Sequence, residues 1–238
     1  MGVLDGKAAI VTGSARGIGR ATAELLADQG ARVLINDLDG DVAEQAASEI
    51  AGETTVFAGD LTQRGMPDQL VQKAVDEFGR IDIIVNNAGY TWDGVAHKMA
   101  DEQFQAMLDI HTVVPFRIIR AAAPHMREPA KAEREQGQEV FRKIVNVTSV
   151  SGTMGNAGQV NYAAAKEEGG KIEMEGKEIQ LGIPEQMRAM AAMMIPLGRA
   201  ASPEEAAGPV FFLCSPWSNY VHGQVLNVTG GQFGGMYI

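Results

Sequence analysis

Short apolar runs alternate along the chain with segments in which apolar residues recur every three or four positions. The run Ala8-Ala9-Ile10-Val11 is continuously apolar, as expected of a strand that is buried on both faces. After a glycine-rich stretch, apolar residues at helical spacing continue to Gly30, which predicts a helix ending on a glycine cap. The same alternation predicts strand, helix, strand, helix and strand at residues 31–37, 41–50, 55–58, 67–78 and 81–86.

This order of elements predicts the fold class. Consecutive parallel strands in one sheet are joined by right-handed crossovers, which place helices on both faces of the sheet. We therefore expect an α/β fold with a doubly wound parallel sheet, Rossmann-like in its arrangement. Because no internal repeat or low-complexity linker divides the sequence, residues 1–238 are expected to form a single domain.

The second half of the chain is less regular. Apolar positions from Phe104 to Ile119 predict one or two long helices, followed by a strand at 144–147. Residues 127–143 are rich in Lys, Arg, Glu and Gln, which favours an exposed helical extension or loop.

The tail carries clearer signals. Ser202, with Pro next and Glu205 three residues on, has the sequence of a capping box and predicts a helix over 203–214. Cys214 ends an apolar stretch and is expected to be a small buried hydrophobe rather than a nucleophile. A final strand is predicted at 224–228.

Composition excludes several classes of partner. The formal net charge is −10, whereas nucleic-acid binding and anionic-membrane binding both need basic surfaces. No apolar run is long enough to cross a bilayer, and the N-terminus lacks the pattern of a signal peptide. His97, His125 and His222 show no metal-ligand spacing, so we expect no metal site. The predicted partner is a small molecule, and the expected compartment is the cytoplasm.

A glycine cluster between the first strand and its helix is the strongest sign of chemistry. In Gly13-x-x-x-Gly17-x-Gly19, a pyrophosphate can rest on unpaired helix N–H groups with no side chains in the way. A bare glycine cluster could be only a tight turn, but the strand before it and the helix after it favour dinucleotide binding.

The spacing of this loop resembles that of the short-chain dehydrogenase/reductase family. Asn86-Asn87-Ala88-Gly89 is similar to the Asn-Asn-Ala-Gly signature of the family, and Ser149, Tyr162 and Lys166 match its catalytic serine and Tyr-x-x-x-Lys in order and spacing. The match covers nearly the whole chain and implies an NAD(P)-dependent oxidoreductase that interconverts a carbonyl and a secondary alcohol, most like the reductases of 3-oxoacyl thioesters carried by acyl carrier protein or coenzyme A. The cofactor-binding residues that the resemblance implies are Gly13, Ser14, Arg16, Gly17, Ile18, Gly19, Asp37, Asp60, Leu61, Asn87, Ala88, Gly89, Tyr162 and Lys166.

The catalytic residues have a chemical rationale of their own. A tyrosine hydroxyl with a pKa of about 10 is a poor base at neutral pH, but a nearby ammonium group stabilises its phenolate. Tyr162 and Lys166 stand at i and i+4 and therefore share a helix face. Ser149 follows a predicted strand and can hydrogen-bond the substrate oxygen while Tyr162 exchanges a proton with it.

Two residues bear on the choice of cofactor. Asp37, at the end of the second strand, is placed to accept hydrogen bonds from the adenosine ribose and would repel a 2′-phosphate. Arg16 favours NADP, because a basic residue in this loop resembles those that hold the 2′-phosphate in some family members. NAD is the favoured cofactor, with NADP the alternative. Asp39 and Asp41 are expected to be the solvated start of a helix.

The sequence departs from the family at two places. His111 stands where many members have an asparagine of the proton relay; histidine can also pass a proton, or it can simply pack between helices. After Lys166, the family has a long helix, a buried strand and a loop that contacts the nicotinamide. Here a few tens of residues are missing, and the residues 171–180 alternate around a glycine and predict an exposed hairpin instead.

The missing block leaves two hypotheses about function open. One is a working reductase, and the other is a dinucleotide-binding relative that has lost turnover. The block would also supply a neighbour for the strand at 224–228, which must otherwise pair across the vacancy or leave a sheet edge exposed. The family resemblance further implies a homo-oligomer, either a dimer or a tetramer.

Overall fold

The computed structural model describes residues 2–149, 171–174, 177–180 and 195–231. Its centre is a five-stranded parallel sheet in the order β3-β2-β1-β4-β5. The predicted doubly wound α/β fold is confirmed, and each of these strands begins and ends close to the predicted residues. The strands are β1 (Ala8–Thr12), β2 (Arg32–Asp37), β3 (Thr54–Ala58), β4 (Ile83–Asn86) and β5 (Lys143–Asn146).

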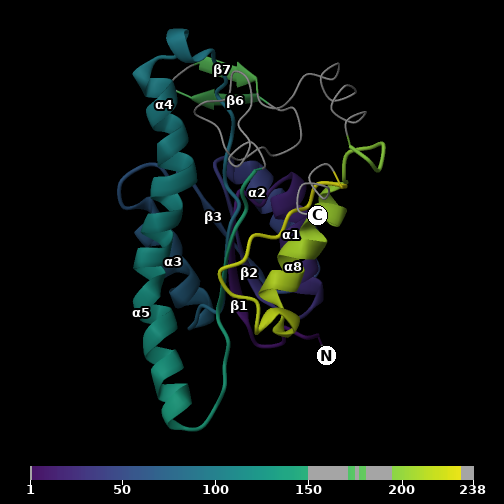
Figure 1. The fold of residues 1–238 in the computed structure, drawn as a ribbon. Helices are drawn as coiled ribbons and strands as arrows, with labels where there is room; N and C mark the ends of the chain where they lie inside the picture. The colour runs from purple at the N-terminus through teal and green to yellow at the C-terminus, as the bar shows by residue number, and fades with distance from the viewer. Residues whose placement is uncertain (1, 150–170, 175–176, 181–194, 232–238) are drawn as a thin grey trace.

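Helices cover both faces of this sheet (Figure 1). Because side chains alternate along a strand, β1 sends Ala9 and Val11 into one layer and Ala8 and Ile10 into the other. All four are almost fully buried, which explains why the run is continuously apolar. The first layer contains α1 (Gly17–Asp28), α2 (Gly40–Glu49) and α8 (Pro203–Cys214); the second contains α3 (Met66–Phe78) and α5 (Val114–Glu135).

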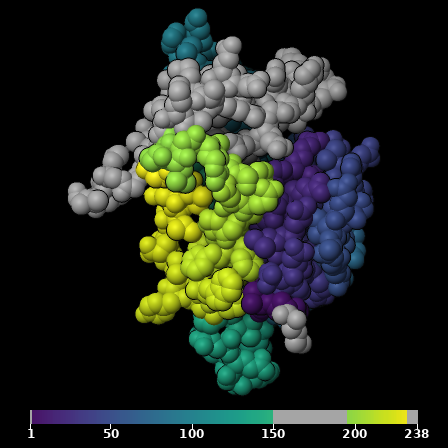
Figure 2. Space-filling view, turned by 90° about the vertical axis from the view of Figure 1, so that its right-hand side faces the viewer, coloured from purple at the N-terminus to yellow at the C-terminus, as the bar shows by residue number. Residues whose placement is uncertain are grey.

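Helix α8 begins as predicted. The Ser202 hydroxyl accepts the Glu205 N–H at 3.3 Å, and the Glu205 carboxylate accepts the Ser202 N–H at 2.9 Å. The helix packs against α1, and Figure 2 shows residues 195–231 beside the N-terminal residues on one face of the molecule. Cys214 is buried, and burial raises the pKa of its thiol to about 12. The packing role predicted for this cysteine is confirmed.

A long helical stretch crosses the second face. It runs through α4 (Asp101–Leu108), the π-helical turn η2 (Asp109–Val113) and α5, after a short helix η1 (Ala96–Lys98). Figure 1 shows the far end of α5 extending beyond the sheet. No helix among the described residues is both long enough and apolar enough to cross a membrane.

The charged segment at 127–143 is helical to Glu135 and largely exposed, in line with the prediction. The prediction is wrong for the last residue of the segment, because Lys143 is the first residue of β5 and is only 8% exposed. The Lys143 ammonium donates to the hydroxyl of Ser218, the last residue of η3 (Pro216–Ser218), at 3.1 Å. This hydrogen bond allows the charge to lie inside.

The strand predicted at 224–228 is wrong. These residues join no ladder in the described part of the sheet, and Val225, Leu226 and Val228 are 72%, 48% and 47% exposed. A strand is stable only beside a hydrogen-bonded neighbour. Within the described residues, β5 pairs with β4 alone, and residues 224–228 have no strand beside them.

The hairpin predicted after Lys166 is confirmed. Strands β6 (Lys171–Met174) and β7 (Lys177–Gln180) pair antiparallel, with Met174 opposite Lys177. They form a two-stranded sheet separate from the central one (Figure 1).

Candidate cofactor and active site

The loop between β1 and α1 lies at the carboxyl edge of the sheet. Gly13 has a φ of +60°, and a side-chain carbon there would lie 2.8 Å from the Cα of Ala88. Both the left-handed backbone and the close approach require glycine. The first turn of α1 contains Gly17, Ile18 and Gly19, holds no acidic residue and receives no side-chain cap from the N-cap residue Arg16. Its N–H groups are therefore suited to an anion.

Thr12 and Asn87 join this loop to the end of β4. The Asn87 side-chain amide donates to the carbonyl oxygens of Thr12 and Gly13 at 2.8 and 2.9 Å. In return, the Thr12 hydroxyl accepts the N–H groups of Asn87 and Ala88 at 3.0 and 2.9 Å. Gly19 lies so close to the Asn87 amide that a side chain would collide with it. Thr12 is the first residue of the loop that resembles the family's cofactor loop, but its link to Asn87 and Ala88 was not predicted from the sequence.

Ser14 braces the loop from within. Its hydroxyl is fully buried, donates to the Val11 carbonyl at 2.7 Å and accepts the Asn36 N–H at 3.1 Å. The Ser14 N–H donates to the Asn36 carbonyl at 2.8 Å. The polar groups of Ser14 are thus used to fix the loop to β2. Asn36 is a second supporting residue that the sequence reasoning missed.

Asp37 ends β2 beside the same loop. Its two carboxylate oxygens accept the N–H groups of Ala15 at 3.2 Å and Leu38 at 2.9 Å. Arg16 instead pairs with Asp39 at 3.2 Å, and both of these side chains are about half exposed.

Asp39 also caps α2, since its side chain accepts the Val42 N–H at 3.3 Å. Asp41 lies in the first turn of the same helix, where a carboxylate complements the helix dipole. Both residues therefore form the helix start that the sequence predicted.

Asp60 and Leu61 form the turn after β3. One oxygen of Asp60 accepts both the N–H and the hydroxyl of Thr62, at 2.9 and 2.7 Å. Leu61 is only 3% exposed and packs in the core layer of α3. The turn is thus fixed by a local hydrogen-bond network on one side and by the core on the other.

His111 lies on the π-helical turn η2, a kind of element that is frequent at functional sites. Its Nε2 donates to the carbonyl oxygen of Tyr90 at 2.9 Å. Tyr90 itself is half-buried, and burial together with the Asp60 and Asp109 carboxylates raises the pKa of its phenol to about 12. The phenol therefore stays neutral, and His111 joins the helical layer to the chain that follows β4.

Ser149 follows β5 toward the same edge. Asn146 lies in register with Asn86, and the Val147 N–H donates to the Asn86 carbonyl at 2.9 Å. The chain thus leaves β5 beside the segment that begins at Asn87. The other two expected catalytic residues, Tyr162 and Lys166, lie outside the described residues.

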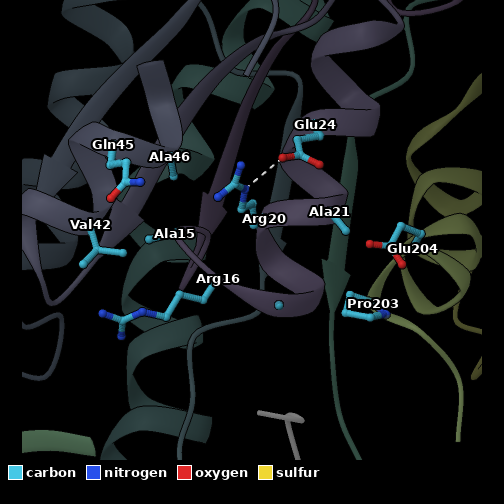
Figure 3. Close-up of a pocket in the computed structure, with 11 residues that line it drawn as sticks. Ala15, Arg16, Arg20, Ala21, Glu24, Val42, Gln45, Ala46, Pro203 and Glu204 are labelled. Atoms are coloured by element: carbon cyan, nitrogen blue, oxygen red, sulfur yellow. Dashed lines mark hydrogen bonds and ion pairs between the residues drawn. The ribbon is translucent and has the colours of Figure 1, made fainter. Parts of the chain in front are cut away.

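A pocket of about 450 Å³ lies between the glycine loop, α1, α2 and the start of α8 (Figure 3). Arg16 and Arg20 line it together with Glu204. Arg20 is held by Glu24 at 2.8 Å and by Glu49 at 2.7 Å, so its charge is already balanced. The pocket borders the glycine loop, since Ala15, Arg16 and Gly17 of that loop line it, whereas Asn87 does not.

Two family profiles match consecutive parts of the chain. The profile described as short chain dehydrogenase matches residues 7–172, and the one described as enoyl-(acyl carrier protein) reductase matches residues 174–232. The first profile ends and the second begins in the β6–β7 hairpin, which is where the sequence departs from the family pattern.

Several curated relatives match over almost their full length. The 3-oxoacyl-[acyl-carrier-protein] reductase FabG of Thermotoga maritima is 34% identical, over 96% of this chain and 98% of the relative. FabG of Vibrio cholerae is 35% identical, over 97% and 98%. The Thermotoga alignment runs over 253 positions, more than the 238 residues of this chain. The relative therefore has residues without a counterpart here.

Two solved structures are also similar to this chain. A short chain dehydrogenase from Mycobacterium avium is 35% identical, with a TM-score of 0.61 over 68% of this chain and 59% of that one. A 7α-hydroxysteroid dehydrogenase, solved with NADH and 7-oxo glycochenodeoxycholic acid, shares the fold with a TM-score of 0.81 over 96% and 94% of the two chains, at 24% identity. With a family profile over more than half of its length and full-length relatives above 30% identity, this chain belongs to the short-chain dehydrogenase family and is an NAD(P)-dependent oxidoreductase.

Proposed function

We propose that the protein reduces 3-oxoacyl thioesters, carried by acyl carrier protein or coenzyme A, to 3-hydroxyacyl thioesters with NADH. The main observation that supports this reaction class is that hydrogen bonds from Asn87 join the glycine loop to the segment after β4. Both lie at the carboxyl edge of the sheet, toward which the chain also runs from β5 to Ser149. The choice of substrate is supported by the relatives named 3-oxoacyl-[acyl-carrier-protein] reductase.

The shape of the loop supports a dinucleotide. The uncapped first turn of α1 would hold the pyrophosphate on its N–H groups. Asp37 would bind the adenosine ribose, while Asp60, Leu61 and the Asn87–Gly89 segment would flank the adenosine. When bound, the cofactor supplies a nicotinamide that gives or takes a hydride. The full set of residues proposed to bind it is the one predicted from the sequence, with Ser14 acting through the shape of the loop.

We propose NAD rather than NADP as the cofactor. The Asp37 carboxylate would repel a 2′-phosphate, and the one cation of this loop, Arg16, is already paired with Asp39. To bind the 2′-phosphate, Arg16 would have to break its ion pair with Asp39. The phosphate would then lie near the carboxylates of Asp37 and Asp39, which would repel it. The local charge therefore favours a free ribose hydroxyl.

The catalytic residues are proposed to be Ser149, Tyr162, Lys166 and His111. In the reductive direction Tyr162 gives its hydroxyl proton to the substrate oxygen as the carbonyl carbon accepts hydride. Lys166 stabilises the phenolate that remains, and Ser149 donates a hydrogen bond to the same substrate oxygen. His111 would return a proton toward Tyr162.

We also propose that the protein works as a homo-oligomer, a dimer or a tetramer, in the cytoplasm. The exposed apolar residues Val225 and Leu226 support a contact between subunits in the tail. A nucleic-acid or anionic-membrane partner is disfavoured by the net charge of −10.

The test follows nicotinamide absorbance after acetoacetyl-coenzyme A is added with NADH or NADPH. We expect NADH to be consumed faster than NADPH, and Tyr162→Phe to abolish consumption. Binding of NADH without turnover of this or other carbonyl substrates, in folded protein, would favour a dinucleotide-binding relative instead. Faster consumption of NADPH would overturn the assignment of NAD.

A further inference from the structure

The ring of His111 fills the space that a side chain at Gly89 would need. A Cβ built on Gly89 would collide with Cε1 of the ring and lie 2.9 Å from its Nδ1, and the third nearest atom is Nε2 of the same ring. Gly89 does not have a positive φ, so its φ does not by itself require glycine. In this chain the imidazole leaves no room for a side chain at position 89.

The same ring holds the next residue in place. His111 Nε2 donates to the Tyr90 carbonyl at 2.9 Å. At the other end of this short segment, the N–H groups of Asn87 and Ala88 are bound by Thr12. The segment is thus fixed to β1 at its start and to the π-helical turn η2 at its end.

We propose that His111 is a positioning residue that sets the place of the Asn87–Tyr90 segment against the glycine loop, and with it the affinity for the cofactor. Gly13 lies against Ala88, and the imidazole lies against the neighbouring residue Gly89. The loop, the segment and the ring are therefore three layers in contact, and the size of residue 111 sets their spacing. The inference rests on the proposed function in taking this segment as part of the cofactor site, and it is separate from the proton transfer proposed for His111.

The test measures NADH binding by fluorescence for Gly89→Ala, His111→Ala and the double variant. Added volume in a packed site is poorly tolerated, so Gly89→Ala in the wild-type background should weaken binding by about tenfold or more. Removing the imidazole makes room for the new methyl group. In the H111A background the same change should therefore alter binding by less than about threefold, a clear departure from additivity.

His111→Asn separates positioning from proton transfer. An asparagine amide can still donate to the Tyr90 carbonyl, so His111→Asn should keep the KM for NADH closer to the wild-type value than His111→Ala does. A residue that acts only in the proton relay would lower kcat in His111→Ala and leave NADH binding unchanged in both variants, which would overturn the proposal.

Gly13→Ala provides the matched control. Its positive φ and its contact with Ala88 do not involve residue 111, so His111→Ala should not rescue it. Equal losses from Gly89→Ala in the wild-type and H111A backgrounds would overturn the proposal. Should Gly89→Ala fail to fold, recovery of the melting temperature in the double variant would support the coupling, and no recovery would refute it. Wild-type protein that binds NADH but reduces no thioester would contradict the proposed function alone.

Discussion

The centre of the sheet and its β5 edge differ in how completely their residues are buried. In β1 and β4 every residue is buried, and Thr12 and Asn87 join the carboxyl ends of these strands. In β5 buried and exposed residues alternate, and Ile144 is 44% exposed. The segment 224–228, predicted as the next strand from the sequence, is exposed as well.

The difference reflects where each strand finds its neighbours. Parallel strands need cover on both faces and a partner on each side, except at an edge. The first four strands obtain these from βαβ units formed by nearby residues, whereas the family resemblance assigns the outer neighbour of β5 to the block missing after Lys166. Within the described residues, β5 has β4 as its only neighbour, while the hydrogen bonds of the cofactor loop are all in place.

The largest effect expected from this comparison concerns buried volume. Ile84 in β4 is fully buried, whereas Leu226 in the tail is 48% exposed. Ile84→Ala should lower the free energy of unfolding by about 2–5 kcal/mol. In protein dilute enough to be monomeric, where the proposed subunit contact of Leu226 is absent, Leu226→Ala should change it by less than about 0.5 kcal/mol. Urea unfolding followed by circular dichroism measures both. Equal losses in the monomer would break the comparison, because they would place Leu226 in the packed interior of the subunit.

A smaller effect is expected from the polar link between the strand ends. Asn87→Ala removes two hydrogen bonds and leaves the carbonyl groups of Thr12 and Gly13 without this donor. We expect a loss of about 1–3 kcal/mol in the free energy of unfolding, together with weaker NADH binding. Gln224 is the control, since its side chain makes an exposed hydrogen bond in the tail; Gln224→Ala should change neither quantity. If Asn87→Ala left NADH binding unchanged, the hydrogen bonds of Asn87 would stabilise the fold without contributing to the cofactor site.

Most of the fold could be predicted because its signals are local. The apolar run of β1, the capping box at Ser202 and the alternation in the β6–β7 hairpin each lie within a few residues of sequence. The family spacing also located the glycine loop and the segment Asn87–Gly89, which the structure brings together.

The remainder depends on partners far away in the chain. The Thr12–Asn87 link joins residues on separate strands, so a single polar residue after an apolar run gives little warning of it. The π-helical turn η2 adds one residue to a turn, which hardly changes the spacing of apolar positions. Residues 224–228 have the composition of a strand, but composition cannot supply the neighbour that a strand requires.

The buried and the exposed region each contain a carboxylate that is paired with an arginine. Asp82, just before β4, is fully buried and accepts two hydrogen bonds of 2.7 Å from Arg80 and one of 3.0 Å from the Ala8 N–H. Burial alone would raise the pKa of Asp82, but these hydrogen bonds and the nearby charges outweigh burial and hold it below its usual value. Glu205 in α8 is exposed, and its hydrogen bonds with Arg199 lower its pKa to about 2.

The smallest effect we expect is a difference in how acid weakens the two regions. The contribution of Asp82 is complete above the pKa of an unfolded aspartate, about 4, and is lost as the pH falls through its lower value in the folded protein. Asp82→Asn should therefore flatten the decline in unfolding free energy below about pH 4. The Glu205 pair is exposed, so salt should screen it, and Glu205→Gln should have little effect on this slope in about 0.5 M NaCl. Urea unfolding between about pH 2 and pH 7, with and without salt, measures both slopes. If salt abolished the decline of the unfolding free energy below about pH 4, and only Glu205→Gln flattened it, the comparison would be reversed. The stronger charge contact would then be the exposed one between Arg199 and Glu205.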